Sequence, residues 1–470
     1  MAPTRRDFLR GTVLAAGAAA LGATVSRGGM EPAVQVGPGQ GVLDLPVPAL
    51  PDPQASGIEH VVVVMMENRS FDHFLGWLPN ANGRQAGLSY TDPNGNAVAT
   101  WHATMPNGCG FNDPDHSYEG GRIEYDGGAM DGFLKDTAND HYAVSYYQAA
   151  DRPFMSQLAL NYTTCDNYFC SILGPTYPNR MFMHAAATDR LDNTSTVSTL
   201  PTIWDRLNVV GGPTGRYYFS DVPFLALWGQ KHLPISAPVE QFFADIAAGT
   251  LPNVSYIDPR FEDEGDGTSN DDHPLADIRA GDSFLSELFG AVSSSSLWER
   301  TLFIVNYDEW GGFFDHVAPP RVTPGVPIGS PASSGVDTDL VGGKVLTGFR
   351  VPAIVASPFT KGSPANPTVA HSFFDHTSVL KLIEWRWGLE PLSARDASTA
   401  AGDPGNLATV LNLAAPDPSV PALPALLPFV PESCAAGNPA IGGGTAPTTA
   451  AAGDDTWAAL RSSPLMKGWR

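Results

Sequence analysis

Two apolar segments of the sequence end in side chains that could bind a divalent cation. Residues 61–66 are uninterrupted Val and Met and are followed by Glu67 and Asn68, while the strand pattern at residues 301–306 is followed by Tyr307, Asp308 and Glu309. Three carboxylates and an amide are a hard, oxygen-rich ligand set, which suits a divalent cation with positions left open for a substrate. A cation bound there would stabilise charge on a phosphoryl oxygen and lower the pKa of a coordinated hydroxyl.

Thr176 is the candidate nucleophile. It lies in Gly174-Pro-Thr-Tyr-Pro178, directly before an apolar helical segment. Pro178 suits the first turn of a helix, because its missing N–H would be unpaired there in any case. Free N–H groups and the helix dipole favour an anion at this end, so a hydroxyl beside them is well placed to attack phosphorus. The plainer interpretation of Thr176 is an N-cap residue.

Histidines follow acidic residues far more often than the composition predicts. Acids are 49 of the 470 residues, yet seven of the 11 histidines come directly after one. Repeated Asp-His pairs in loops indicate metal ligation, or imidazoles that are oriented by carboxylates. The seven are His60, His73, His116, His141, His273, His316 and His376.

The elements that must position these groups are strands that alternate with helices. A continuous apolar run is typical of a central strand that is covered on both faces. The alternation predicts an α/β fold with a doubly wound, mostly parallel sheet and helices on both faces. In such a sheet the ligand site lies at the carboxyl ends of the strands. Further strands are predicted at residues 253–258 and 351–357, and helices at residues 154–168, 278–292 and 377–387.

The N-terminus has the pattern of an export signal. Arg5-Arg6-Asp-Phe-Leu precedes an apolar, acid-free stretch, which is typical of a twin-arginine signal peptide. An ordinary secretion signal is the alternative. We therefore expect residues 1–29 to direct the chain to the twin-arginine translocase, and the protein to be secreted or associated with the cell envelope. The cleavage point is left open.

The rest of the chain divides by composition. Residues 30–57 are a linker rich in Pro and Gly, residues 58–413 are the expected catalytic domain, and residues 414–470 are a tail rich in Pro, Ala and Gly. We expect this tail to pack poorly apart from residues 457–460.

Charge and cysteine content exclude several classes of protein. A formal net charge of −22 argues against nucleic acid as a partner and against adhesion to anionic lipid through basic clusters. The cysteines lack paired CxxC spacing, so a zinc site built on cysteine is excluded. Outside the cytoplasm one or two disulfides are expected, with the pairing open, among Cys109, Cys165, Cys170 and Cys434.

Five ordered motifs between Ile58 and about Leu413 resemble the bacterial phosphoesterase family. This family joins phospholipases C with certain acid phosphatases, and the resemblance implies an alkaline-phosphatase-like fold. The Thr of Gly-Pro-Thr favours the phospholipase branch. The motifs are Met-Met-Glu-Asn-Arg-Ser-Phe-Asp-His, Gly-Pro-Thr-Tyr-Pro-Asn-Arg, Asp-Asp-His-Pro-Leu-Ala-Asp-Ile-Arg-Ala-Gly, Tyr-Asp-Glu-Trp-Gly-Gly-Phe-Phe-Asp-His and Phe-Asp-His-Thr-Ser-Val-Leu.

The resemblance also implies a role for each candidate residue. Thr176 would form a phosphothreonine intermediate, and His116 and His273 would contact phosphate or act as general acid. Asn179 is expected to bind substrate. The metal ligands, for a divalent cation of unknown identity, would be Glu67, Asn68, Asp308 and Glu309.

The expected activity is that of an exported, metal-dependent phospholipase C, which releases diacylglycerol and a phosphorylated head group. A broad acid phosphatase acting on phosphomonoesters is the first alternative. A non-catalytic, exported surface protein that binds a cation is the second, from a different class. The expected partners are a phospholipid or small phosphoester, with transient contact at a membrane surface and no nucleic acid.

Overall fold

The structure is a computed structural model that describes residues 49–50, 52–331, 335–434 and 456–469. The predicted signal peptide at residues 1–29, most of the linker and the low-complexity run at residues 442–452 lie outside these ranges. Within the described ranges, no helix has both the length and the apolar character needed to cross a membrane.

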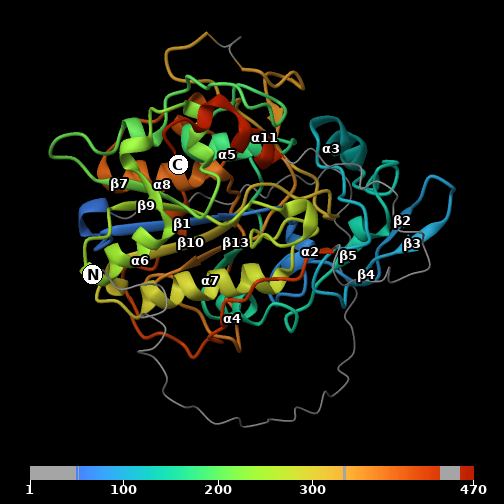
Figure 1. The fold of residues 1–470 in the computed structure, drawn as a ribbon, viewed down its shortest axis with the longest axis horizontal. Helices are drawn as coiled ribbons and strands as arrows, with labels where there is room; N and C mark the ends of the chain where they lie inside the picture. Colours follow the sequence, from blue (N-terminus) through green and yellow to red (C-terminus); the bar gives the residue numbers. More distant parts are fainter. Residues whose placement is uncertain (1–48, 51, 332–334, 435–455, 470) are drawn as a thin grey trace.

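An eight-stranded sheet forms the centre of the molecule (Figure 1). Neighbouring strands are parallel except at β13, which runs antiparallel to both of its neighbours. In spatial order the strands are β14 (Val369–Ala370), β6 (Thr163–Cys165), β13 (Ala353–Ala356), β10 (Thr301–Tyr307), β1 (His60–Met66), β9 (Val254–Asp258), β7 (Gly215–Phe219) and β8 (Ser236–Pro238).

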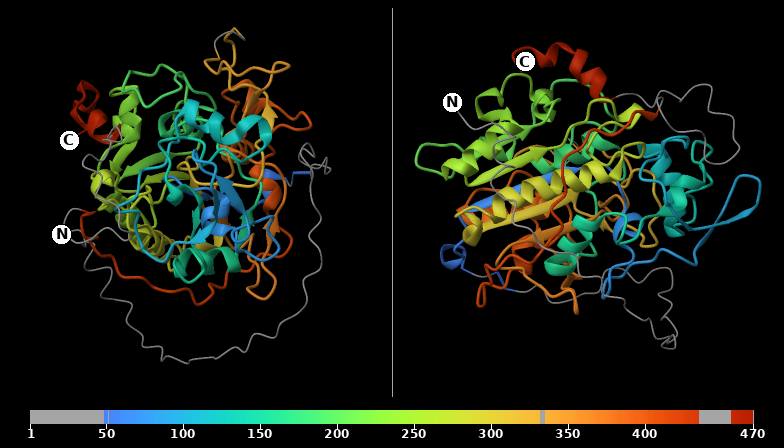
Figure 2. Two further views of the ribbon diagram at one scale, coloured as in Figure 1. Left: turned by 90° about the vertical axis from the view of Figure 1, so that its right-hand side faces the viewer. Right: turned by 60° about the horizontal axis from the view of Figure 1, so that its bottom comes forward.

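Helices cover both faces of this sheet, as the two further views confirm (Figure 2). On one face α5 (Thr176–Ala185) packs against α8 (His376–Trp387), and on the other α4 (Pro153–Asn161) packs against α7 (Ile278–Ser293). The predicted doubly wound, mostly parallel α/β fold is therefore confirmed. The remaining helices are α2 (Phe71–Leu75), α3 (Tyr118–Tyr125), α6 (Val239–Ala248), α9 (Ala394–Ala397) and α11 (Thr456–Ser462), and the minor strands are β2 (Ser89–Thr91), β3 (Ala97–Ala99), β4 (Trp101–His102), β5 (Ser145–Tyr146), β11 (Arg321–Val322) and β12 (Val345–Leu346).

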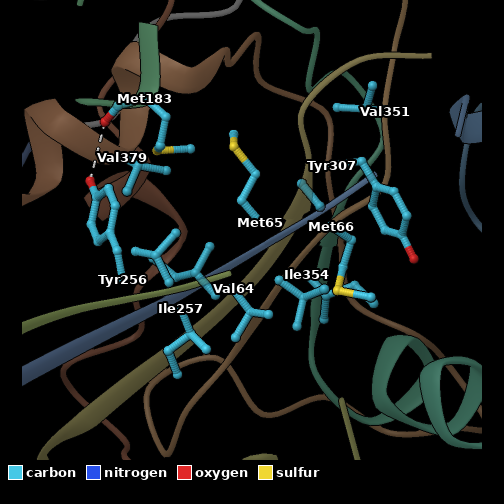
Figure 3. Close-up of a cluster of buried hydrophobic side chains, with 14 of the residues drawn as sticks. Val64, Met65, Met66, Met183, Tyr256, Ile257, Tyr307, Val351, Ile354 and Val379 are labelled. Atoms are coloured by element: carbon cyan, nitrogen blue, oxygen red, sulfur yellow. Dashed lines mark hydrogen bonds between the residues drawn. The ribbon is translucent and has the colours of Figure 1, made fainter. Parts of the chain in front are cut away.

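Strand β1 is central because its side chains are buried on both faces of the sheet. Figure 3 shows Met65 on the side of Met183 from α5 and Val379 from α8, with Met66 on the opposite side. Full burial of such a side chain contributes about 1.5–3 kcal/mol. Met66 is in register with Tyr307 of β10, so the residues that follow the two strands leave the sheet side by side.

The sequence prediction was wrong in two places. The helix expected at residues 154–168 ends at Asn161, and β6 (Thr163–Cys165) follows almost at once. Thr163 and Thr164 are β-branched residues that fit a strand, but the adjoining apolar helix pattern concealed them. The expectation for the tail holds for most of residues 414–430, which are exposed, and for Trp457 and Leu460, which are buried. It fails where Ser286 of α7 hydrogen-bonds residues 424 and 426 and where Cys434 forms a disulfide with Cys109.

A buried charge cluster joins helix α2, which follows β1, to the loop after β10. The Arg350 guanidinium donates to Asp315 at 2.9 Å and to Asp72 at 3.2 Å, and all three side chains are fully buried. His316 contacts the other oxygen of Asp72 at 2.5 Å. Backbone N–H groups, that of Arg84 among them, also donate to these carboxylates. The cluster is therefore satisfied by its own donors and acts as a structural clamp.

Arg350→Ala is expected to lower the free energy of unfolding by about 3–5 kcal/mol, because it removes the buried cation that pairs with two buried carboxylates. Urea denaturation measures this change. Arg300→Ala is the matched control, since Arg300 pairs with Glu59 at the surface at 3.1 Å and such pairs contribute about 1 kcal/mol or less. Equal effects of the two substitutions would contradict the clamp.

Candidate active site

The four predicted metal ligands meet at the carboxyl ends of β1 and β10. Glu67, Asn68, Asp308 and Glu309 are all buried, and the Asp308 N–H donates to the Met66 carbonyl at 3.1 Å. The Asn68 amide donates to Glu309 at 2.6 Å, across 241 residues of sequence. The parallel register of the two strands therefore brings the two halves of the candidate site together.

Gly311 allows the chain to turn tightly under this site. Its φ of +64° is in the left-handed region that favours glycine. A Cβ at this position would lie 2.2 Å from the Asn68 carbonyl oxygen, so no side chain fits. The Gly311 N–H donates to Glu309 at 2.7 Å and fixes that carboxylate.

Arg180 is a member of the site that the sequence analysis did not single out. Its Nε donates to Asp308 at 3.0 Å and to Glu67 at 3.3 Å, and Nη1 donates to Asp258 at 3.1 Å. The available signal was its spacing, because a residue four positions after Thr176 lies on the same side of the helix. Arg180 supplies positive charge to carboxylates that would otherwise repel one another.

Thr176 is the first residue of α5 and is 3% exposed. Pro175 precedes it as the N-cap and makes no side-chain hydrogen bond, and in the first turn the Tyr177 N–H donates to Asn193 Oδ1 at 2.8 Å. The side chain of Asn179 lies beneath this turn. It accepts from the Ile172 N–H at 3.1 Å, and its amide donates to backbone carbonyls that include Gly174 at 2.7 Å. The Asn179 amide therefore holds the loop before Thr176, rather than reaching a substrate.

His116 and His273 come from separate loops and face each other, with ring centroids 6.1 Å apart. His116 Nε2 lies 3.8 Å from Glu309 Oε1. His273 Nε2 lies 3.6 Å from Asp113 and 3.9 Å from Glu264, two residues that the sequence analysis did not select. Asp113 lies three residues before His116 and Glu264 nine residues before His273, and the composition of both loops is that of ordinary turns, so no residue type there marked these two acids.

Burial dominates the electrostatics of the carboxylates. It raises the pKa of Glu309 to about 8 and that of Asp308 to about 6, although Arg180 acts to lower the latter. Burial together with the neighbouring Asp308 raises the pKa of Glu67 well above its ordinary value. For His116 burial acts to lower the pKa, but the carboxylates of Glu309 and Asp113 outweigh it and raise the pKa to about 9.

These residues fit a bound divalent cation. Buried, crowded carboxylates with raised pKa values are stabilised either by protonation or by a bound cation. A bound cation balances their charge while they stay ionised. Glu67, Glu264 and His273 each place a ligand atom within 4.8 Å of the others. Several buried polar atoms around the site have no hydrogen-bond partner, namely Asn68 Oδ1, Asp113 Oδ1, Glu264 Oε1, Asp271 Oδ2 and His273 Nδ1.

A hydroxyl at the start of a helix, with Arg180 of the same helix in contact with two candidate metal ligands, suits phosphoryl transfer. Comparison with known proteins supports this class. The model of the Phosphoesterase family matches residues 58–218 and 216–390. The chain belongs to the phosphoesterase family, and it is a hydrolase that acts on phosphoric esters.

Relatives with similar sequences include two proteins of Mycobacterium tuberculosis and one of Arabidopsis thaliana. Phospholipase C B is 33% identical over 92% of this chain and 91% of its own length. Phospholipase C A is 31% identical over 91% of this chain and 90% of its own length. The plant non-specific phospholipase C6 is 31% identical over 73% of this chain and 71% of its own length.

Solved structures are less similar. A protein of the alkaline phosphatase superfamily from Vibrio parahaemolyticus aligns with a TM-score of 0.34 and 11% identity, over 79% of this chain and 73% of that one. The phosphonate monoester hydrolase of Agrobacterium radiobacter aligns with a TM-score of 0.35 and 11% identity, over 75% of this chain and 77% of that one.

Proposed function

We propose that the protein is an exported, metal-dependent phosphodiesterase of phospholipase C type. It would cleave a phospholipid such as phosphatidylcholine into diacylglycerol and a phosphorylated head group. The observation that carries the proposal is the position of Thr176, at the start of a helix whose Arg180 contacts both Glu67 and Asp308. The phospholipase C relatives, similar along nearly the whole chain, favour a phospholipid substrate.

In the proposed reaction Thr176 loses its hydroxyl proton to solvent, Oγ1 attacks phosphorus, and the bond from phosphorus to the glycerol oxygen breaks. Diacylglycerol leaves with a proton from His116, and the head-group phosphate remains on Thr176 as a phosphothreonine diester. A water molecule then attacks phosphorus and gives a proton to His116, which restores the acid. The bond from phosphorus to Thr176 Oγ1 breaks, Thr176 takes up a proton from solvent, and the phosphorylated head group leaves. The cation, when bound, withdraws charge from a phosphoryl oxygen.

The protein's own residues support each step. Asn68, Glu309, Glu67 and Asp308 would hold the cation, with Arg180 orienting the last two. Asn179 fixes the loop before the nucleophile and so positions Thr176. His273 would contact a phosphate oxygen, because burial lowers its pKa and keeps its ring neutral. Export through the twin-arginine pathway remains a proposal that rests on Arg5 and Arg6.

The test compares two products with purified, metal-analysed protein. Phosphocholine released from phosphatidylcholine vesicles is measured beside inorganic phosphate released from p-nitrophenyl phosphate. We expect the first to exceed the second at equal enzyme concentration. The opposite ranking would indicate an acid phosphatase, and no turnover of any phosphoester would indicate a cation-binding protein without catalysis.

The rate is expected to fall at alkaline pH, about tenfold per pH unit, because a general acid must be protonated. The pKa of His116 is raised to about 9, so the group is charged below this pH and loses its proton above it. A cation bound to Glu309 would weaken the attraction between Glu309 and the protonated His116. The alkaline fall of the pH–rate curve is therefore expected at or somewhat below pH 9. His116→Gln should lose this limb and about 10²-fold or more in kcat. The measurement is kcat/KM from pH 6 to 10.5, and an unchanged limb in the variant would exclude His116 as the acid.

A further inference from the structure

The C-terminal helix α11 lies beside the start of the helix that carries Thr176 (Figure 1). The Tyr177 hydroxyl donates to the Thr456 carbonyl at 2.8 Å. The Asn193 amide donates to the Thr456 hydroxyl at 3.2 Å, while its oxygen accepts from the Tyr177 N–H at 2.8 Å. Two hydrogen-bonded paths therefore join α11 to the residue next to the proposed nucleophile.

Trp457 extends these contacts to the charged centre of the site. Its side chain is 1% exposed, and its ring stacks on Phe261 at a centroid distance of 3.8 Å and an angle of 3°. The guanidinium carbon of Arg180 lies 4.6 Å from the Phe261 ring and 5.6 Å from the Trp457 ring. Trp457 also meets Tyr177 edge to face at 5.5 Å.

Packing on aromatic rings matters for Arg180 because the position of its guanidinium fixes the positions of two carboxylates. It donates to Glu67 and Asp308 on one side, and the two aromatic rings hold its planar group on the other. The flexible stem of an arginine loses conformational entropy when the side chain is fixed in one position. Packing on two fixed rings restricts the Arg180 side chain in advance, so less entropy is lost when it binds the carboxylates. Loss of Trp457 would remove one of the two aromatic rings that lie beside the Arg180 guanidinium.

The far end of the tail is anchored separately. Trp469 donates to the Gly229 carbonyl at 2.9 Å and meets Phe219 at 6.1 Å, while Gln230 donates to the Lys467 carbonyl at 3.0 Å. Leu460 is fully buried as well. Because α11 is held at several points, Trp457 is presented to Phe261 by a docked element.

We propose that Trp457 is a positioning residue of the active site, which acts through Phe261 and Arg180 on Glu67 and Asp308 and through Tyr177 on the helix start at Thr176. The C-terminal helix is then part of the catalytic apparatus of this chain. This inference rests on the proposed function, because it assumes that the two carboxylates bind the cation and that Thr176 is the nucleophile.

The test is a double-mutant cycle in the full-length protein. Trp457→Ala is expected to lower kcat by on the order of tenfold to 10²-fold and to weaken the binding of Mn²⁺, used as the probe cation, in calorimetry. Trp457→Phe, which keeps a ring on Phe261, should restore most of both. If Trp457 acts through Arg180, its truncation should have much less effect in the Arg180→Lys background, and additive effects would overturn the proposal.

Trp298→Ala is the matched control for loss of a buried tryptophan that holds the tail. Trp298 is 3% exposed, packs on Phe289 at 5.4 Å and donates to the Pro418 carbonyl at 2.9 Å. It should lower the melting temperature but keep kcat and Mn²⁺ affinity within about twofold. Equal losses in the two alanine variants, or a Trp457→Ala enzyme with normal kcat, would make α11 a passive cover.

The two proposals fail in different ways. A wild-type protein that turns over no phosphoester would overturn the proposed function. An active wild-type enzyme, inactivated by Thr176→Ala but unaffected by Trp457→Ala, would overturn the positioning role alone.

Discussion

Thr176→Ala is expected to lower kcat by a factor on the order of 10³ or more, with the fold and melting temperature retained. The substitution removes the hydroxyl oxygen that we propose forms the covalent intermediate, and losses are large when a nucleophile itself is removed. Thr176 has a small side chain and is the first residue of α5, so alanine fits the same backbone. The measurement is phosphocholine release at saturating substrate, with circular dichroism to verify folding.

Two variants sharpen this experiment. Thr188→Ala removes a hydroxyl that donates to the Arg190 carbonyl at 3.0 Å, shortly after the same helix, and should keep normal turnover. Thr176→Ser keeps the hydroxyl and should recover most of the activity. Quenching the wild-type reaction on phosphatidylcholine in acid should trap phosphocholine on Thr176, detected by mass spectrometry. An alanine variant with near-normal turnover would exclude Thr176 as the nucleophile.

Exhaustive chelation is expected to abolish turnover, and a divalent cation should restore it. The carboxylates at the ends of β1 and β10 are buried, and without a cation this burial raises their pKa values, to which repulsion by Asp308 adds at Glu67 and Glu309. Elemental analysis before and after chelation measures the metal. Full activity in protein that contains no metal would remove all four ligands from that role.

Glu309→Gln separates metal binding from general stability. With a pKa raised to about 8, the Glu309 carboxyl is protonated near pH 7 when no cation is present, so glutamine should change the apo stability little. The wild-type protein should gain about 2.7 kcal/mol at a cation concentration of 100 times Kd, and the variant should lose most of this gain. Asp282→Asn is the control, because this buried carboxylate accepts from the N–H groups of Phe154 and Met155 instead. It should keep the gain in stability that the cation provides.

The central part of the fold could be predicted because local and global signals agree. A strand covered on both faces is largely apolar along its length, so strands could be recognised at residues 61–66 and 301–306 without knowledge of the strands they pair with. The parallel arrangement then placed Glu67 and Asp308 at one edge. Pro178 marked the start of α5, and Gly388, with a φ of +66°, ends α8 where the sequence predicted.

The remaining features depend on tertiary contacts that leave little trace in sequence. The antiparallel direction of β13 cannot be read from four apolar residues. Arg180 has the appearance of an ordinary helical arginine until the strands bring carboxylates to it. Trp457 stands in a tail dominated by Pro, Ala and Gly, and only the docking surface at Phe261 gives it a role.

The position of β1 in the sheet has a consequence for biosynthesis. Its two neighbours, β9 and β10, begin at Val254 and Thr301, so the strand emerges from the ribosome long before either partner exists. At about 5–20 residues per second, the wait is on the order of ten seconds or more. During that time four consecutive valines and two unpaired strand edges are free to associate with other chains. The strand that carries the first half of the site is therefore also the segment that most needs a chaperone while the chain is being made.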